Sequence, residues 1–239
     1  MVRPEDHAAV LDTLRAGDLE VVGRLVGSSN NAMVVVVRPG DLLAVWKPTR
    51  GERPLFDFPI GTLTRREVAA YLVSEALGWG IVPPTILREG PFGEGSLQRF
   101  VEIDPGADVV AMLRAANPRL RRIAVFDAIV NNTDRKGGHL LPVRGGHLYA
   151  VDHGVTFSVV PKLRTLLWAW EGEPFDDAEL AGLQRVEAAL ATGRLAVQLR
   201  DLLSEAEVQA TTERVGALLD AGVFPGPNPD WPAIPWPPF

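Results

Sequence analysis

Two carboxylates near the middle of the chain stand where apolar segments end. Asp134 follows the mostly apolar run 123–130, and Asp152 follows the apolar run 148–151 and precedes Gly154. A glycine turn at 144–146 predicts a hairpin between them, which brings the two acids together. Phosphoryl transfer from a nucleotide needs one carboxylate near the attacking hydroxyl and a second that holds a divalent metal on the phosphates. We assign the first role to Asp134 and the second to Asp152.

Three polar residues near Asp134 complete this predicted site. Asn132 is expected to shape the loop that carries Asp134. Lys136 could place its ammonium over the transferred phosphoryl group, or could be an exposed loop lysine. His139 has the spacing from Asp134 at which protein kinases place a metal-binding asparagine. Because imidazole is a softer ligand than Mg²⁺ prefers, His139 predicts manganese, an indirect contact with the metal, or impaired catalysis.

A lysine and a glutamate in the first half fit the same chemistry. Lys47 ends the predicted strand 42–47, as does the kinase lysine that pairs with the nucleotide phosphates. Glu67 lies on the next predicted helix, where the carboxylate that orients this lysine would be. The alternative is a capping box with Thr64, in which Glu67 would bond to the start of its own helix.

Two further segments could contact a nucleotide. Gly27, Ser28 and Ser29 lie between two predicted strands, where backbone N–H groups could cover phosphates, although the same composition is typical of a simple hairpin turn. Gln98 and Phe100 lie where a hinge contacting adenine would run. The turn, lysine, glutamate, hinge and two acids follow one another in the order found in kinases.

The acidic segments also resemble a known group of kinases. Residues 132–135 (Asn-Thr-Asp-Arg) and 152–154 (Asp-His-Gly) are similar to the catalytic and metal-binding loops of phosphatidylinositol 3- and 4-kinases, especially the type II 4-kinases, and of the HipA toxin kinases. Over its whole length the chain resembles an actinobacterial family of uncharacterised phosphatidylinositol-kinase-like proteins. The resemblance implies a bilobal kinase-like fold, Asp134 as the catalytic acid, Asp152 as the metal ligand, ATP as phosphate donor and Mg²⁺ or Mn²⁺ as the metal.

The resemblance leaves the acceptor open, and the site departs from the family in three places. Protein, lipid and small-molecule hydroxyls all remain acceptors. His139 replaces the usual asparagine, and Lys136 stands where many relatives have histidine. His153 replaces a phenylalanine, which we expect to weaken the hydrophobic anchoring of the metal loop.

The elements that must position these residues form an α+β fold. Short β-branched or apolar runs predict strands at 18–26, 32–37, 42–47, 83–87 and 96–101, the first three as an antiparallel meander. Helical spacing predicts a helix that stops at Gly17, a main helix at 62–77, helices at 108–116 and 118–130, and several more between 162 and 221. We therefore expect a nucleotide lobe at 1–102, a helical catalytic lobe at 103–223 and a Pro/Trp-rich arm at 224–239.

The arm allows two interpretations. Its apolar residues would be costly to expose, which favours docking on the helical lobe, whereas a partner-binding peptide is the alternative. These residues are Trp231, Ile234, Trp236 and Phe239.

Composition narrows the function classes. The chain has no cysteine, which excludes disulfides, thiolate metal sites and cysteine nucleophiles. A net charge of −6 without a long basic run argues against a nucleic-acid partner and against strong attraction to anionic membranes. We find no transmembrane segment and no secretory signal, so we expect a cytoplasmic protein.

Two alternatives to a kinase remain open. His139, His147 and His153 lie close together in sequence, which allows a His/Asp metal-dependent hydrolase, although the spacing fits no known motif and His147 begins the strand that ends at Asp152. A nucleotide-binding pseudokinase that acts through protein interaction would fit the missing asparagine and the aromatic arm.

Overall fold

The computed structural model of the chain describes residues 4–25 and 31–239. Its strands are β1 (Asp18–Arg24), β2 (Met33–Arg38), β3 (Leu42–Pro48), β4 (Thr85–Gly90), β5 (Gly93–Arg99), β6 (Leu140–Pro142) and β7 (Leu148–Ala150). Its α-helices are α1 (Pro4–Ala16), α2 (Leu63–Leu77), α3 (Val109–Arg114), α4 (Arg121–Val130), α5 (Asp177–Ala191), α6 (Arg194–Arg200) and α7 (Glu205–Ala221). The predicted α+β class is confirmed, while Gly27, Ser28 and Ser29 lie outside the described residues.

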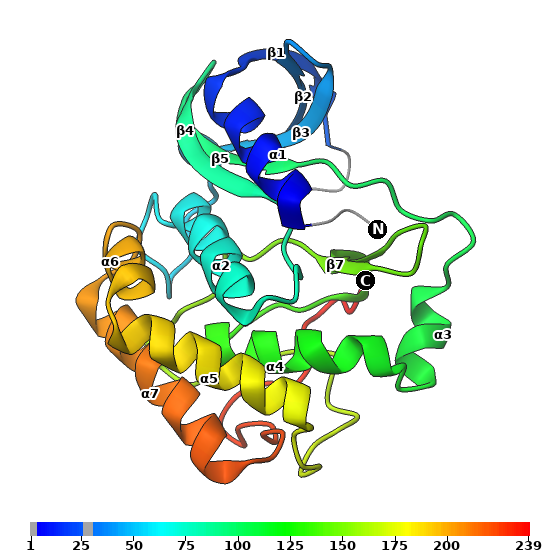
Figure 1. Cartoon of the computed structure of the whole chain (residues 1–239), viewed down its shortest axis with the longest axis vertical. Coiled ribbons are helices and arrows are strands. Elements are labelled where there is room, and N and C mark those ends of the chain that lie inside the picture. The colour runs from blue at the N-terminus through cyan, green and yellow to red at the C-terminus, as the bar shows by residue number, and fades with distance from the viewer. Residues whose placement is uncertain (1–3, 26–30) are drawn as a thin grey trace.

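Strands β1 to β5 form one antiparallel sheet in the order β1-β2-β3-β5-β4, which contains the predicted meander. Side chains alternate between the two faces of a strand. On one face, Val35, Ala44 and Trp46 form an apolar cluster with Leu14 of α1, which lies across the sheet in Figure 1. Lys47 follows Trp46 and therefore points to the opposite face, where it meets α2.

The helices α2, α4, α5, α6 and α7 share a second apolar core. Leu77 of α2, Phe126 and Ile129 of α4, Leu183 of α5 and Val215 of α7 all belong to it. Figure 1 shows α2 between the sheet above and the helices α4, α5 and α7 below, with α6 beside it. Since α2 packs on these helices and also meets β3, it is the element that relates the sheet to the helical part.

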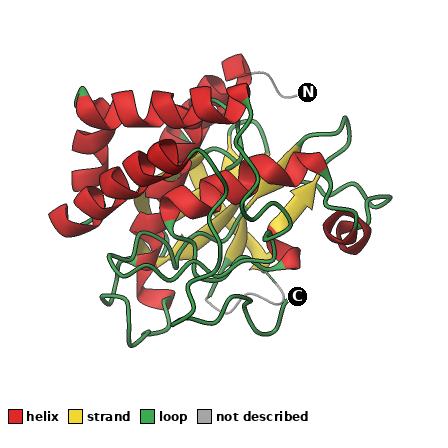
Figure 2. Cartoon of the chain, turned by 90° about the horizontal axis from the view of Figure 1, so that it is seen from below, coloured by secondary structure: helices red, strands yellow, loops and turns green. Residues whose placement is uncertain are grey.

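A long irregular segment precedes the last three helices. The sequence predicted helices between 162 and 221, and the first of them begins only at Asp177, after a capping box of Asp176 and Glu179. Two residues before Asp177 disfavour an earlier start of the helix. Gly172 is in the left-handed conformation at φ 74°, and Pro174 has no backbone N–H to donate. Figure 2 shows the helices gathered toward one side of the molecule and the irregular segments along the other. Within the described residues, no helix is long and apolar enough to cross a membrane.

A buried ion pair fixes α2 on the helical core. The guanidinium of Arg66, which is 1% exposed, pairs with Glu207 of α7 and donates to the carbonyl oxygen of Thr156 at 2.6 Å. Burial would raise the pKa of Glu207, but the Ser204 N–H and Arg66 outweigh burial and hold that pKa below its ordinary value of 4.5. The ion pair therefore stabilises the fold above pH 4.5, and this contribution is lost as the pH falls through the lowered pKa.

We expect Glu207→Gln to lower the free energy of unfolding at pH 7 by about 3 kcal/mol, because it leaves the Arg66 charge buried and unpaired. The difference from the wild-type chain should shrink as the pH falls below 4.5 and through the lowered pKa, where Glu207 in the folded chain itself becomes protonated. Urea titrations at pH 7 and pH 3.5 measure the loss of stability at neutral pH and its decrease in acid. The matched control is Glu205→Gln, which removes a fully exposed ion pair with Arg200; equal losses for the two variants would show that the Arg66 pair is unimportant.

The C-terminal arm, residues 224–239, returns along the irregular segment 161–168. Thr165 N–H and Trp168 Nε1–H both donate to the carbonyl oxygen of Ala233, at 3.0 and 2.9 Å. The arm thus contacts the helical lobe, which is the interpretation that the sequence favoured, but Trp236 is 86% exposed and Ile234 53% exposed. Hydrogen bonds to the arm's backbone, which require no burial of these side chains, hold it in place.

Candidate active site

The side chain of Lys47 joins β3 to α2 and to the segment after β7. Its Nζ pairs with Oε1 of Glu67 and lies 3.1 Å from Oδ1 of Asp152. Burial alone would lower the pKa of Lys47, but the two carboxylates outweigh burial and raise it above its ordinary value. The ammonium in turn holds the pKa of Asp152 well below its usual range. Both groups are therefore charged at neutral pH, and the Asp152 side chain, 44% exposed, can reach a ligand.

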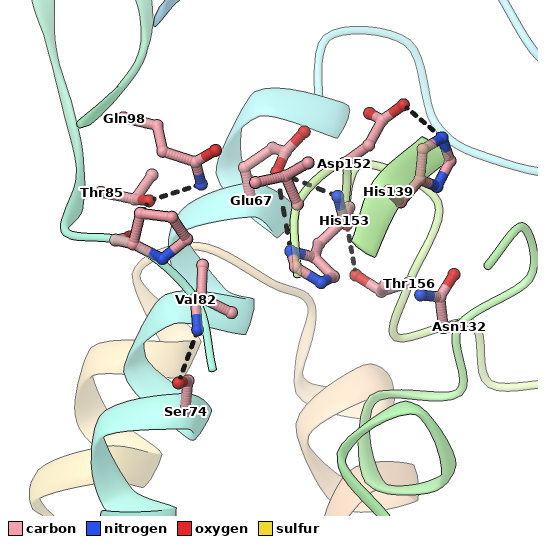
Figure 3. Close-up of polar contacts among 12 residues, drawn as sticks. Glu67, Ser74, Val82, Thr85, Gln98, Asn132, His139, Asp152, His153 and Thr156 are labelled. Carbon is pink, nitrogen blue, oxygen red and sulfur yellow. Dashed lines mark hydrogen bonds and ion pairs between the residues drawn. The ribbon is translucent and has the colours of Figure 1, made fainter. Parts of the chain in front are cut away.

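Glu67 serves this cluster and not the start of its own helix. Helix α2 begins after Thr62, which makes no side-chain capping bond, so the capping-box alternative for Glu67 and Thr64 is wrong. The second carboxylate oxygen of Glu67, Oε2, accepts a hydrogen bond from the backbone N–H of His153 at 3.0 Å (Figure 3). Glu67 thus orients Lys47 with one oxygen and holds the segment after Asp152 with the other.

The loop that carries Asp134 starts at the end of α4, where Asn131 ends the helix in the left-handed conformation at φ 50°. The next side chain, Asn132, is fully buried and shapes this loop. Its Nδ2 donates to Oδ1 of Asp127 at 2.9 Å, and its Oδ1 accepts from the backbone N–H of Asp134 at 3.0 Å. Asn132 therefore fixes the backbone of Asp134 against α4.

Arg135 and Asp127, which the sequence analysis did not single out, form the buried centre of the site. Both side chains have 0% exposure, and the guanidinium binds the carboxylate through two bonds, Nε to Oδ2 at 2.9 Å and Nη2 to Oδ1 at 2.8 Å. Arg135 also donates to the carbonyl oxygen of Val151 at 2.9 Å, next to Asp152. This pair ties α4, the loop of Asp134 and the segment of Asp152 together. A carboxylate inside the apolar run 123–130 is the signal that could have revealed it.

His153 is anchored by polar contacts in place of the apolar ones that a phenylalanine would make. Its ring is 0% exposed, stands edge-on to Phe126 at 5.2 Å and lies 2.7 Å from Nη2 of Arg135. Because arginine only donates, Nε2 of His153 must accept and the ring proton lies on Nδ1. Burial and the Arg135 charge lower the pKa of His153 well below its ordinary value, so the ring is neutral. The contact with Arg135 therefore adds a polar anchor to the apolar contact with Phe126.

Two cations face the Asp134 carboxylate. Lys136 Nζ lies 3.3 Å from Oδ2, and Arg164 Nη2 lies 3.6 Å from Oδ1. Arg164, a residue that the sequence analysis missed, is held by a 2.7 Å bond from its Nε to the carbonyl oxygen of Thr133. Burial nevertheless raises the pKa of Asp134 against these two charges. Lys136, predicted as a cation over the phosphoryl group, thus lies beside the predicted catalytic acid.

His139 and Asp152 meet at the predicted metal position. Nε2 of His139 lies 3.4 Å from Oδ2 of Asp152 (Figure 3), and burial lowers the pKa of His139 to about 4, so its ring is neutral at pH 7. The backbone N–H of Lys136 donates to Nδ1 of His139 at 3.4 Å, which places the ring proton on Nε2, toward Asp152. The Asp152 carboxylate could bind a metal as it stands, whereas Nε2 of His139 could do so only after its proton has moved to another atom.

The predicted metal ligands are two residues, and this suits a metal that is shared with phosphates. Within the described residues, no group of three or more His, Cys, Asp or Glu side chains could hold a metal ion. Mg²⁺ in nucleotide sites is bound by one or two carboxylates together with substrate phosphates and waters. The donor set at Asp152 therefore fits a metal brought with a nucleotide, and the described residues do not form a metal cage of their own.

The other predicted site residues make contacts outside this cluster. Gln98 is buried and its amide donates to Oγ1 of Thr85 at 2.8 Å (Figure 3), while the N–H of Phe100 donates to the carbonyl oxygen of Leu43 at 2.9 Å. His147 points elsewhere, to the carbonyl oxygen of Gly80 at 2.8 Å. The three-histidine arrangement of the hydrolase alternative is therefore not formed.

The amino-acid sequence of the chain is similar to that of several known proteins. No family model matches the chain. Protein Rv2133c of Mycobacterium tuberculosis is 42% identical over an alignment of 275 residues that covers 100% of this chain and 97% of that protein. Phosphatidylinositol 4-kinase gamma 1 and gamma 8 of Arabidopsis thaliana are 29% and 26% identical over 51% and 65% of this chain, which spans only 27% and 38% of their length.

A solved structure shares the fold. The crystal structure of the Helicobacter pylori proinflammatory kinase CtkA matches with a TM-score of 0.55 at 11% identity, over 87% of this chain and 93% of that one. The α+β arrangement described above is therefore the bilobal kinase-like fold that the sequence predicted, and the chain belongs to the family of Protein Rv2133c of Mycobacterium tuberculosis.

Proposed function

We propose that the chain is a kinase-like phosphotransferase that moves the γ-phosphate of ATP to a hydroxyl acceptor. The observation that supports this most is the ion-paired group of Lys47, Glu67 and Asp152, which joins the sheet, α2 and the segment after β7. Kinases use such a lysine on the phosphates, such a glutamate to orient it and such an aspartate on the metal. Asp134 supplies the remaining carboxylate. Asn132 holds its backbone, and the next residue, the buried Arg135, binds the segment that carries Asp152.

In this proposal, Asp134 receives the proton of the acceptor hydroxyl. The acceptor oxygen forms a bond to the γ-phosphorus, the bond from that phosphorus to the bridging oxygen breaks, and ADP leaves. Burial raises the pKa of Asp134, which makes its carboxylate a stronger base than an exposed one. Lys136 and Arg164 place positive charge where negative charge develops. A bound Mg²⁺ or Mn²⁺, held by Asp152, would neutralise phosphate charge.

The proposal assigns parts of the chain to parts of the reaction. Residues 1–102 would hold the nucleotide, with Gln98 and Phe100 near the adenine and residues 27–29 near the phosphates, and residues 103–223 would carry the transfer chemistry. The acceptor class stays open between protein, lipid and small molecule. The two arginines at the start of α4 are engaged within the chain, since Arg121 is paired with Glu173 and Glu179 and Arg122 lies over the Trp79 ring.

His139→Asn is expected to shift the metal preference. An asparagine at this position offers an amide oxygen, which Mg²⁺ accepts more readily than imidazole nitrogen. We expect the ratio of ATP affinity with Mg²⁺ to that with Mn²⁺ to rise about tenfold, measured by calorimetry. The control is His147→Asn, which alters a histidine bonded to Gly80 and away from the site. An unchanged ratio in His139→Asn would remove His139 from the metal environment.

A nucleotide-binding pseudokinase is the second candidate function. His139 carries its ring proton toward Asp152, at the predicted metal position, and this feature disfavours fast transfer. A pseudokinase would bind ATP with a metal and release no ADP above background.

Turnover of ATP tests the proposal. The purified chain is incubated with γ-labelled ATP, Mg²⁺ or Mn²⁺ and one acceptor class at a time: a mixed protein substrate, inositol-lipid vesicles, or polyol and sugar alcohols. We expect ADP and labelled acceptor in at least one arm, and neither in Asp152→Ala. Equal ADP formation by the wild-type chain and Asp152→Ala in every arm would contradict the proposal, and nucleotide binding without ADP would favour the pseudokinase.

A further inference from the structure

The end of the C-terminal arm lies against the turn that carries Lys136 and His139. The backbone N–H of Gly137 donates to the carbonyl oxygen of Pro238 at 2.9 Å, and the Phe239 ring lies against the Cα of Gly137. A Cβ at position 137 would collide with the ring carbons of Phe239, so the close approach of the arm requires glycine here. Figure 1 shows the C-terminus beside β7, on the side of the view away from the helix α7 that precedes the arm.

This turn holds two residues of the proposed site at once. Gly137 begins the short 3-10 helix η3 (Gly137–His139), whose last residue is His139 at the Asp152 carboxylate. Lys136, just before it, pairs with Asp134. A displacement of Gly137 would therefore move both the cation beside the catalytic acid and the histidine beside the metal ligand.

The anchoring of the arm does not depend on its end alone. Trp236 is 86% exposed and buries little apolar surface, and Phe239, 56% exposed, buries less than half of its own. The rest of the arm is anchored earlier along the chain, at Ala233 and at Asn228, whose Nδ2 donates to the carbonyl oxygen of Pro161 at 2.8 Å. Contacts at Gly137 therefore act on the turn itself more than on global stability.

We propose that residues 238–239 are a positioning element of the active site, which clamps the Gly137–His139 turn through the Pro238 carbonyl oxygen and the Phe239 ring. The role of this clamp in catalysis rests on the proposed function, whereas the clamp itself rests on the contacts at Gly137. Neither Pro238 nor Phe239 touches the reacting groups in this account; they act through the backbone of Gly137.

Amide hydrogen exchange tests the clamp without any assumption about ATP. Exchange of the Gly137 amide is compared in the full chain, in Phe239→Ala and in a chain shortened to end at Pro237, with Trp236→Ala as a matched control on the same arm. We expect about tenfold faster exchange in the shortened chain, a smaller increase in Phe239→Ala, and no change in Trp236→Ala. Unchanged Gly137 exchange in the shortened chain would overturn the proposal.

A second comparison links the clamp to the site. Gly137→Ala should displace the turn because its methyl group meets the Phe239 ring, and Phe239→Ala in the same chain should relieve that displacement. We therefore expect Gly137→Ala to weaken Mn²⁺-dependent ATP binding about tenfold and the double variant to recover most of it. Additive effects would contradict the clamp. If the wild-type chain binds no ATP, the proposed function fails while the exchange comparison still decides the clamp.

Discussion

Asp134→Asn is expected to reduce phosphoryl transfer about 10²–10⁴-fold while leaving ATP affinity within about twofold of the wild-type value. The asparagine keeps the size of the side chain but cannot accept the proton of the acceptor hydroxyl. The loop should stay in place, because the backbone N–H of residue 134 still donates to Asn132 and Arg135 still binds Asp127. ADP release and calorimetric ATP binding measure the two quantities separately.

The pH profile gives this prediction a second readout. The carboxylate must be ionised to act as a base, and burial raises its pKa. Turnover should therefore fall as the pH drops through that raised pKa, and the residual turnover of Asp134→Asn should lack this acid limb. If Asp134→Asn transfers phosphate at the wild-type rate, Asp134 has no part in the chemistry.

Arg135→Met is expected to lower the free energy of unfolding by about 3–5 kcal/mol, because it leaves the Asp127 carboxylate charged, fully buried and without its cation. The remaining donors to Asp127 are the Asn132 amide at 2.9 Å and the more distant Thr165 hydroxyl at 3.5 Å. The free energy of unfolding of a native domain is about 5–15 kcal/mol, so this single substitution removes a large part of the stability.

Urea titration at pH 7 measures this loss, with Arg200→Met as the control. Arg200 also pairs with a carboxylate, Glu205, but both groups are fully exposed, and we expect no measurable change there. The double variant Arg135→Met with Asp127→Leu should recover part of the loss, since it removes the uncompensated charge. A loss in Arg135→Met no larger than in Arg200→Met would show that this pair does not hold the site together.

The sequence predicted the fold class because strands and helices follow from local patterns. Short runs of β-branched or apolar residues predict β2 and β3, and Gly78 in the left-handed conformation ends α2. The order of the residues along the chain also grouped Lys47, Glu67 and Asp152, which the structure brings into contact. Short-range spacing also marked Asn132, whose contacts are with residues two and five positions away.

Contacts between distant segments could not be predicted in this way. Nothing in local spacing pairs Arg66 with Glu207 or brings Arg164 to Asp134. The choice of Glu67 between its own helix and Lys47 was likewise open, because both partners are chemically adequate and only the packing of α2 against β3 decides between them. Composition also does not reveal how the arm is held: its backbone hydrogen bonds allow Trp236 to stay exposed.

The central claim is that Asp152 holds a metal that recruits ATP beside Lys47. Calorimetric titration of the chain with ATP, in Mg²⁺, in Mn²⁺ and without metal, tests it directly when Asp152→Ala is measured alongside. We expect metal-dependent ATP binding that disappears in Asp152→Ala while the variant stays folded by circular dichroism. ATP binding that is independent of metal, or that survives unchanged in Asp152→Ala, would contradict it.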